Sequence, residues 1–156
     1  MTYKQEGGLS AGVTWVVVAD GGRARIFSRA KRFSDLRPVD VLDEPDARAR
    51  ERDLTSDQPG RSFDSHGSGR HAVGQESGAK DEIMEDFARR IAHRIEAGRT
   101  GGDFQHLILV AAPTVLGAIR PILSQSSGQL IVSEVSKNLA HHEPADIQKI
   151  IDREFG

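Results

Sequence analysis

The chain contains no cysteine, and this excludes disulfide bridges and thiolate metal sites. It has no apolar run near the roughly 20 residues of a membrane-spanning helix, and residues 1–12 lack the basic region, apolar stretch and cleavage site of a secretory signal. It also has no excess of positive charge, because the formal net charge is −2. No global field therefore draws the protein to nucleic acid or to an anionic membrane. We expect a cytoplasmic protein without membrane insertion, in which any contact with a polyanion depends on a local basic patch.

The composition fits a soluble globular protein of one domain. The chain has 156 residues, of which 37% are hydrophobic and 28% are charged, a balance that allows one core of modest size and some unstructured chain. We interpret the polar, glycine-containing residues 1–12 as a flexible N-terminus. Residues 13–156 are interpreted as a single domain that carries a long polar loop at about 44–76.

The first part of this domain has the pattern of three antiparallel strands. Residues 13–19, VTWVVVA, are β-branched and apolar, as in a central strand that is covered on both faces. An Asp-Gly-Gly turn follows at 20–22, and residues 23–28 and 36–42 alternate between apolar and polar side chains. Pro38 cannot donate to a neighbouring strand, so we expect the third strand at an edge of the sheet.

A long amphipathic helix is expected next. Ser77 suits an N-cap, and Gly98 suits the C-terminal end of a helix. Apolar residues recur between them at spacings of three and four: Met84, Phe87, Ala88, Ile91 and Ile95. The spacing predicts one buried face.

Strands and helices alternate in the rest of the chain. The apolar runs at 105–111 and 130–135 predict buried strands, and the helix between them begins at Pro113 and should be kinked or shortened by Pro121. A last helix begins near Pro144. Two strands joined by a helix form a right-handed parallel crossover. The predicted fold class is therefore α/β, a mixed five-stranded sheet with helices packed on it, in the order β-β-β-α-β-α-β-α.

The segment 58–80, QPGRSFDSHGSGRHAVGQESGAK, is the least core-like part of the domain. It holds five glycines and almost no large apolar residue, so it cannot bury enough surface to offset the entropy of ordering it. It is either a flexible linker or a functional loop that a partner orders.

The same segment carries the best local basic patch. Basic side chains on a glycine-rich backbone can grip phosphates, and an aromatic ring can stack on a base. The candidate contact residues for RNA or another partner are Arg61, Phe63, His66, Arg70, His71, Gly74, Gln75 and Lys80. The alternative is an ordinary flexible loop whose charges serve solubility, since Asp57, Asp64 and Glu76 dilute the positive field.

Four separated stretches resemble bacterial host attachment proteins. They are VVVADGGRARIF, GRSFDSHGSGRHAV, EDFARRIA and LILVAAPTVLGAIR, and the likeness runs from about Val13 to the C-terminus. The fold of that family looks like the ribonuclease-H-like middle domain of archaeal and eukaryotic peptide-chain release factors. The resemblance implies the strand order 3-2-1-4-5. It implies a function less firmly, because the biochemical activity of the family is poorly defined.

The resemblance also suggests one catalytic candidate. Release-factor middle domains carry a basic, glycine-rich loop that ends in Gly-Gly-Gln just before a long helix, and that glutamine places a water for peptidyl-tRNA hydrolysis. Here HGSGRHAVGQ holds the same relative place, with Gly74 and Gln75 at the end and Val73 at the first glycine position. A β-branched valine strongly disfavours the backbone angles that this glycine permits. We therefore expect a protein that is not an enzyme, with Gln75 as the catalytic residue if it is a hydrolase.

The sequence offers two possible metal sites, and each has a simpler interpretation. Asp20 could join Asp103 and Glu134 in a two-metal nuclease site, or it could be a turn residue that bonds its own backbone. Zinc could be held by Asp64, His66 and His71, with a contribution from the His-His-Glu run at 141–143. Neither set matches a strong metal signature, so we expect neither a metal nor another cofactor.

The sequence therefore favours a non-enzymatic protein of the host attachment family. We expect it to contact RNA, the ribosome or a protein through the loop at 61–75. The alternative is a release-factor-like hydrolase that acts on peptidyl-tRNA or RNA esters. A third interpretation is a structural protein, in which a dimer is favoured slightly over a monomer.

Overall fold

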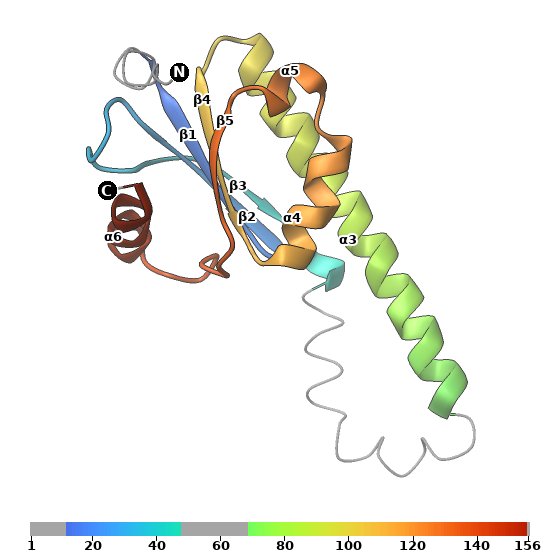
Figure 1. The fold of residues 1–156 in the computed structure, drawn as a ribbon. Coiled ribbons are helices and arrows are strands. Elements are labelled where there is room, and N and C mark those ends of the chain that lie inside the picture. Colours follow the sequence, from blue (N-terminus) through green and yellow to red (C-terminus); the bar gives the residue numbers. More distant parts are fainter. Residues whose placement is uncertain (1–11, 48–68, 156) are drawn as a thin grey trace.

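The structure is a computed structural model that describes residues 12–47 and 69–155, with the backbone alone at 69–77, 79–80 and 155. One sheet lies between helices on its two faces (Figure 1). The elements in chain order are β1 (Thr14–Ala19), β2 (Arg23–Arg29), β3 (Arg37–Asp43), α3 (Gly69–Thr100), β4 (His106–Ala111), α4 (Pro113–Ile119), the 3₁₀ turn η1 (Arg120–Ile122), α5 (Gln125–Gly128), β5 (Ile131–Val135) and α6 (Pro144–Phe155).

The sheet has five strands in the order β3-β2-β1-β4-β5. β1 pairs antiparallel with β2 on one side and parallel with β4 on the other. β4 also pairs in parallel with β5, as expected for two strands joined through α4. The predicted α/β class, the strand order and the edge position of β3 are all confirmed.

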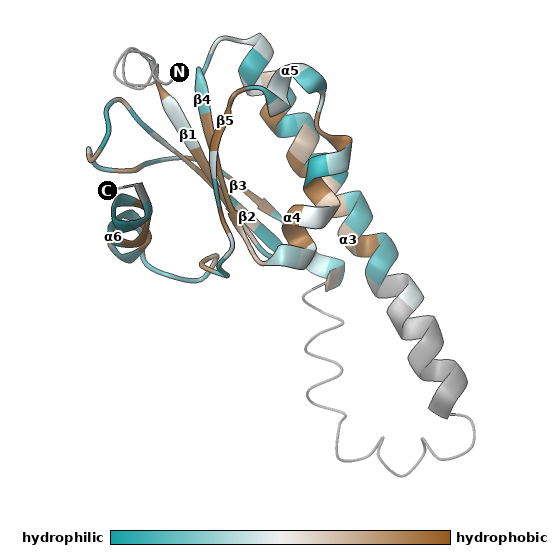
Figure 2. Cartoon of the chain, viewed as in Figure 1, coloured by the Kyte–Doolittle hydropathy of each residue, from teal (hydrophilic) through white to brown (hydrophobic). Residues whose placement is uncertain are grey.

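Side chains of β1 pack in two separate cores, because successive residues of a strand point to opposite faces. Trp15 and Val17 lie in the core beneath α3 and α4, and Val16 and Val18 lie in the core beneath α6. Every residue of β1 is buried. Figure 2 shows how the apolar residues gather on the strands and on the helix faces that meet them.

The edge strand β3 is unsuited to pairing with another chain. A register shift interrupts its pairing with β2 between Ile26 and Phe27, and Pro38 offers no backbone donor. The Asp40 carboxylate accepts from the backbone N–H of Val41 at 2.8 Å and from Arg94 Nε at 2.7 Å. The Arg94 contact lowers the pKa of Asp40. Bulges, proline and inserted charges are known devices against edge-to-edge association.

Helix α3 begins earlier than expected. The interpretation of 69–80 as part of a loop, with a cap at Ser77, is wrong for the backbone, which is helical from Gly69. Between the glycines stand good helix formers, including Ala72, Gln75 and Lys80, and a helix propagates easily once a packed part has nucleated it. Although α3 is long, neither it nor any other helix of the described residues is apolar enough to cross a membrane.

Gly98 does not end α3, contrary to the sequence-based expectation. The helix continues to Thr100, and Gly98 is where α3 crosses Trp15: a Cβ at this position would stand 2.4 Å from Cη2 of Trp15. The glycine that serves the helix end is Gly102, at φ +75°, and the N–H of Asp103 returns to the carbonyl of Gly98 at 2.9 Å.

Pro121 shortens the helix after β4, as predicted. α4 ends at Ile119, and Pro121 lies in the 3₁₀ turn that follows. The short helix α5 is then tied to α3 through Glu96, which accepts from the hydroxyls of Ser124 and Ser127, each at 2.7 Å. A hydrogen bond from Arg99, with these two serine contacts next, lowers the pKa of Glu96 to about 2.

Candidate functional site

The carboxyl ends of the parallel strands β1 and β4 meet at one edge of the sheet, here called the carboxyl edge. Ligands of open α/β sheets bind at such edges, where loops and helix starts leave the strands. In this protein the edge also receives the start of β2 and the end of β3, because both pair with their neighbours in antiparallel fashion.

Asp20 follows β1 and shapes the turn into β2. Its Oδ1 accepts from the backbone N–H of Gly22 at 2.8 Å and from that of Arg23 at 2.7 Å. These bonds confirm the interpretation of Asp20 as a turn residue that bonds its own backbone. They leave Oδ2 directed at a distant part of the chain.

That distant part is the segment before α6. His141 Nε2 lies 3.0 Å from Oδ2 of Asp20, and Arg25 Nη1 donates to the carbonyls of Ala140 at 3.1 Å and His142 at 2.6 Å. His141 is thus held through its ring by Asp20 and through its flanking backbone by Arg25. Its side chain is still 65% exposed. Sequence reasoning missed this arrangement, and the Asp-Gly-Gly turn and the paired histidines gave no signal that they meet.

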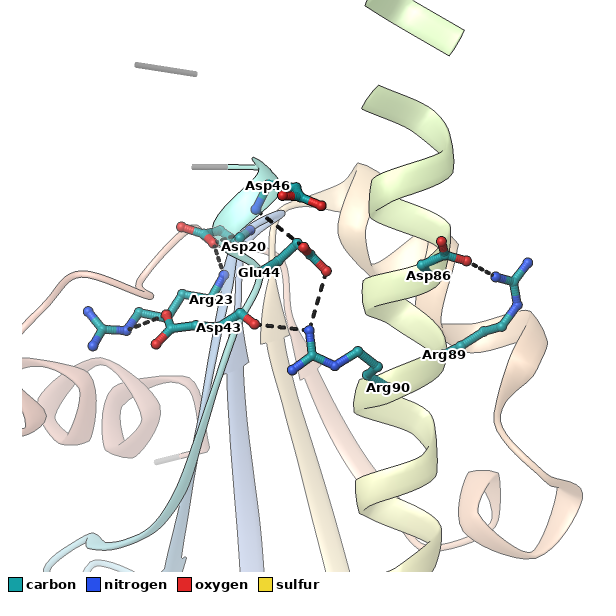
Figure 3. Close-up of polar contacts among 9 residues, drawn as sticks. Asp20, Arg23, Asp43, Glu44, Asp46, Asp86, Arg89 and Arg90 are labelled. Carbon is teal, nitrogen blue, oxygen red and sulfur yellow. Dashed lines mark hydrogen bonds and ion pairs between the residues drawn. The ribbon is translucent and has the colours of Figure 1, made fainter. Parts of the chain in front are cut away.

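A second group of charges links the end of β3 to α3 (Figure 3). Arg90 Nη1 donates to the Asp43 carbonyl at 2.9 Å and to Glu44 Oε1 at 3.3 Å. Arg23 Nε stands 3.8 Å from Asp43 Oδ1, too far for a hydrogen bond, and has no hydrogen-bond partner within the described parts of the chain. In Figure 3 the Arg23 side chain points away from α3.

Asp103 and Glu134 do not join Asp20 in a two-metal site, so this interpretation is wrong for these two residues. Glu134 accepts from Arg120 Nε at 2.9 and 3.1 Å and raises the pKa of that guanidinium. Asp103 precedes β4, at the opposite edge of the sheet, because β4 runs parallel to β1. Within residues 12–47 and 69–155, no three histidine or acidic side chains are grouped so that they could hold a metal.

The structure describes only some of the proposed zinc ligands. Asp64 and His66 lie outside the described residues, and His71 is described in its backbone alone. At the C-terminal side, the His141 ring is directed to Asp20. Zinc binding by Asp64, His66 and His71 therefore stays a sequence-based hypothesis.

The predicted contact residues fall into two groups. Arg61, Phe63 and His66 lie outside the described residues. The others occupy the first turns of α3, with only their backbone described: Arg70, His71, Gly74, Gln75 and Lys80. Gly74 and Gln75 were expected in the loop before the helix and stand inside the helix instead. Val73 is sterically compatible with this conformation, since right-handed helical angles are allowed for L-residues such as valine.

Comparison with known proteins identifies a family. The model of a family described as "Protein required for attachment to host cells" matches residues 15–151, a range that holds nearly the whole sheet, the described helices α3, α4 and α5, and much of α6. A comparison with curated proteins gives no match.

Proposed function

The chain belongs to the host attachment protein family, and from this premise we propose that it is an RNA-binding domain that meets its RNA on the ribosome. The contact is made by the segment 61–75 and by the first turns of α3. The proposal places the protein in the cytoplasm of a bacterium, where ribosomes are found. It treats the protein as a binding module and not as an enzyme.

One observation supports this proposal most directly. α3 has 32 residues, and among its described side chains those that pack in the core begin at Met84 and Phe87. Residues 69–83 span about 22 Å at 1.5 Å per residue, and Figure 1 shows this part of α3 reaching past the sheet. Arg70, His71 and Lys80 are carried on this extension.

Cations of the contact segment and of the extension, Arg61, Arg70 and Lys80, can meet a polyanion, and the acids Glu76, Asp81 and Glu82 oppose it. Guanidinium and ammonium groups contact phosphates and release counterions, and the ring of Phe63 offers a stacking surface for a base. By contrast, several arginines of the packed body are paired with carboxylates, among them Arg94 with Asp40 and Arg29 with Asp152. Such paired cations contribute little to binding another anion.

The test is fluorescence anisotropy with labelled single-stranded RNA, followed by co-sedimentation with purified ribosomes, both at low salt. A variant with Arg61→Ala, Arg70→Ala and Lys80→Ala should bind at least tenfold more weakly. Its slope of log affinity against log salt should fall by about 0.7 for each phosphate contact removed.

The matched control removes three cations from the packed body: Arg37→Ala, Arg89→Ala and Lys149→Ala. It changes the net charge by the same amount and should keep the wild-type affinity. If wild type binds neither RNA nor ribosomes, or if both triple variants lose affinity equally, the proposal is wrong.

The hydrolase alternative depends on Gln75. In an α-helix the backbone N–H of residue 75 points along the axis toward residue 71, so a water placed by Gln75 would need the side chain alone. Peptidyl-tRNA hydrolysis by wild type that is lost in Gln75→Ala, with unchanged far-UV circular dichroism, would favour this alternative over a pure binding module.

A further inference from the structure

We propose that Arg23, Arg25 and His141 form a binding site for a phosphate group at the carboxyl edge, on the side of the sheet that α6 covers. This site is separate from the RNA contact proposed above and does not depend on it. The inference comes from Arg25, which meets backbone carbonyls and no carboxylate among the described residues, and from Arg23, whose Nε lies 3.8 Å from Asp43 without a hydrogen bond.

Arg25 is fixed in place by groups that do not neutralise it. Its Nη1 donates to the carbonyls of Ala140 and His142, and its guanidinium lies over the ring of Phe27, 5.1 Å from the centroid. Among the described residues, no carboxylate comes within ion-pair distance of Arg25. The remaining N–H groups of an oriented guanidinium can receive a phosphate in bidentate fashion.

Arg23 adds a second positive charge on the same face of the sheet. Residues 23 and 25 are two apart on β2, which places their side chains about 7 Å from each other on one face. Burial, and next the charge of Arg23, lower the pKa of Arg25. Neighbouring like charges oppose each other's ionisation, so an anion between them would stabilise both.

Other arginines of the packed body behave differently. The nearest carboxylate oxygen lies at 2.7 Å from Arg29, 3.3 Å from Arg90, 2.7 Å from Arg94 and 2.5 Å from Arg120. Arg23 Nε lies 3.8 Å from the Asp43 carboxylate, and within residues 12–47 and 69–155 this nitrogen has no hydrogen-bond partner. A polar hydrogen left unmatched in a protein is costly, and a ligand that accepts from it removes this cost.

His141 completes the site. Asp20 holds Nε2 of the ring, and Arg25 holds the backbone on either side. Nδ1 has no partner in the part of the chain that the structure describes. Because the ring is exposed and yet oriented, it can offer Nδ1 to a hydroxyl of a phosphate monoester or, when protonated, donate to an oxygen.

Carboxylates near the site set its selectivity. Asp20 is already saturated by two backbone N–H groups and His141, and Asp43 and Glu143 lie near Arg23 and Arg25. These carboxylates repel any anion, so binding depends on hydrogen bonds to the two guanidinium groups. A tetrahedral dianion with several acceptor oxygens gains from the paired geometry of two guanidinium groups.

The experiment is a titration of the full chain with inorganic phosphate, followed by calorimetry and by the NMR signals of the His141 ring. Wild type should bind phosphate saturably at millimolar concentration, with the His141 signals shifting along the same curve. Arg23→Gln and Arg25→Gln should each weaken binding at least tenfold. Arg89→Gln, which removes an arginine paired within its own helix, should bind as wild type does.

Arg23→Gln is the decisive variant, because Arg25 also anchors the backbone at 140–142. A second titration with adenosine monophosphate and with RNA oligonucleotides, with and without a 5′-phosphate, separates the sources of the ligand. Tighter binding of the phosphorylated oligonucleotide assigns the site to an RNA end, and equal binding of inorganic phosphate assigns it to the free ion. Absence of saturable binding, or binding unchanged in Arg23→Gln with intact circular dichroism, overturns the proposal.

Discussion

The two ends of α3 are parts of one helix but differ in what holds them. From Met84 to Thr100, side chains such as Phe87, Ile91 and Ile95 are buried against the sheet. From Gly69 to Lys80 the helix continues past the sheet (Figure 1). The comparison teaches that continuity of a helix does not imply one role. The packed end stabilises the fold, and the extended end carries the residues that we propose for binding.

The largest contrast should come from the same substitution in both ends. Ala88→Pro removes a helix bond in the packed end, where Ala88 is 2% exposed, and should lower the free energy of unfolding by about 3 kcal/mol or more. Gly74→Pro in the extended end should lower it by less than about 1 kcal/mol, because only local structure opens. Urea denaturation followed by circular dichroism measures both. Equal losses would show that α3 is one cooperative unit.

A smaller loss is expected from crowding the packed end at Gly98. A Cβ there would stand 2.4 Å from Cη2 and 2.7 Å from Cζ3 of Trp15. Gly98→Ala should therefore cost about 1–3 kcal/mol through overpacking, although alanine favours a helix over glycine. Trp15 is the only tryptophan, so its fluorescence should shift with the displacement. Gly78→Ala, where nothing lies within 4 Å of the added Cβ, is the matched control and should be neutral or stabilising.

A pH-dependent effect is also expected in the packed end. The pKa of Glu96 is lowered from 4.5 to about 2, first by Arg99 and then by Ser127 and Ser124. A lowered pKa means that the carboxylate stabilises the fold above the unfolded value and that this contribution is lost as the pH falls from 4.5 toward 2.

Thermal unfolding of wild type and Glu96→Gln at a series of pH values measures this contribution. The difference in Tm should be largest above about pH 5 and should shrink toward pH 2, because the contribution is lost between the two pKa values. A difference that does not depend on pH would mean that the hydrogen bonds of Ser124 and Ser127 act without the charge of Glu96.

The smallest effect on stability is expected at the extended end itself. Arg70→Ala and Lys80→Ala should change the free energy of unfolding by no more than about 0.5 kcal/mol, because substitutions outside a packed core usually stay within this range. They should nevertheless weaken RNA binding. Denaturation and anisotropy on the same preparations give both values. A large loss of stability would show that Arg70 and Lys80 stabilise the fold, as the residues of the packed end do.

The strands of the sheet could be predicted from the sequence because each strand has a local pattern of its own. β-branched runs and alternation predict β1 to β5, and Pro38 predicts an edge. The start of α3 was missed because the glycines at 69, 74 and 78 have low helix propensity, and a packed end can extend a helix through them. Gly98 was misjudged because its close approach to Trp15 is a contact between distant residues.

The candidate site at the carboxyl edge was harder to predict for the same reason. Asp20 was interpreted correctly as a turn residue, since its bonds are local. Its contact with His141, and the grip of Arg25 on the neighbouring backbone, arise only when α6 packs on the sheet. Neither the spacing nor the composition of the sequence predicts these contacts between distant residues.

Hydrogen exchange along α3, with and without purified ribosomes, tests the central claim most directly. We predict strong protection of residues 84–100 in both states, and protection of residues 69–80 that rises when ribosomes are added. Exchange at 69–80 that ribosomes leave unchanged, while wild type binds them through another surface, would contradict the assignment of the extended end as the binding element.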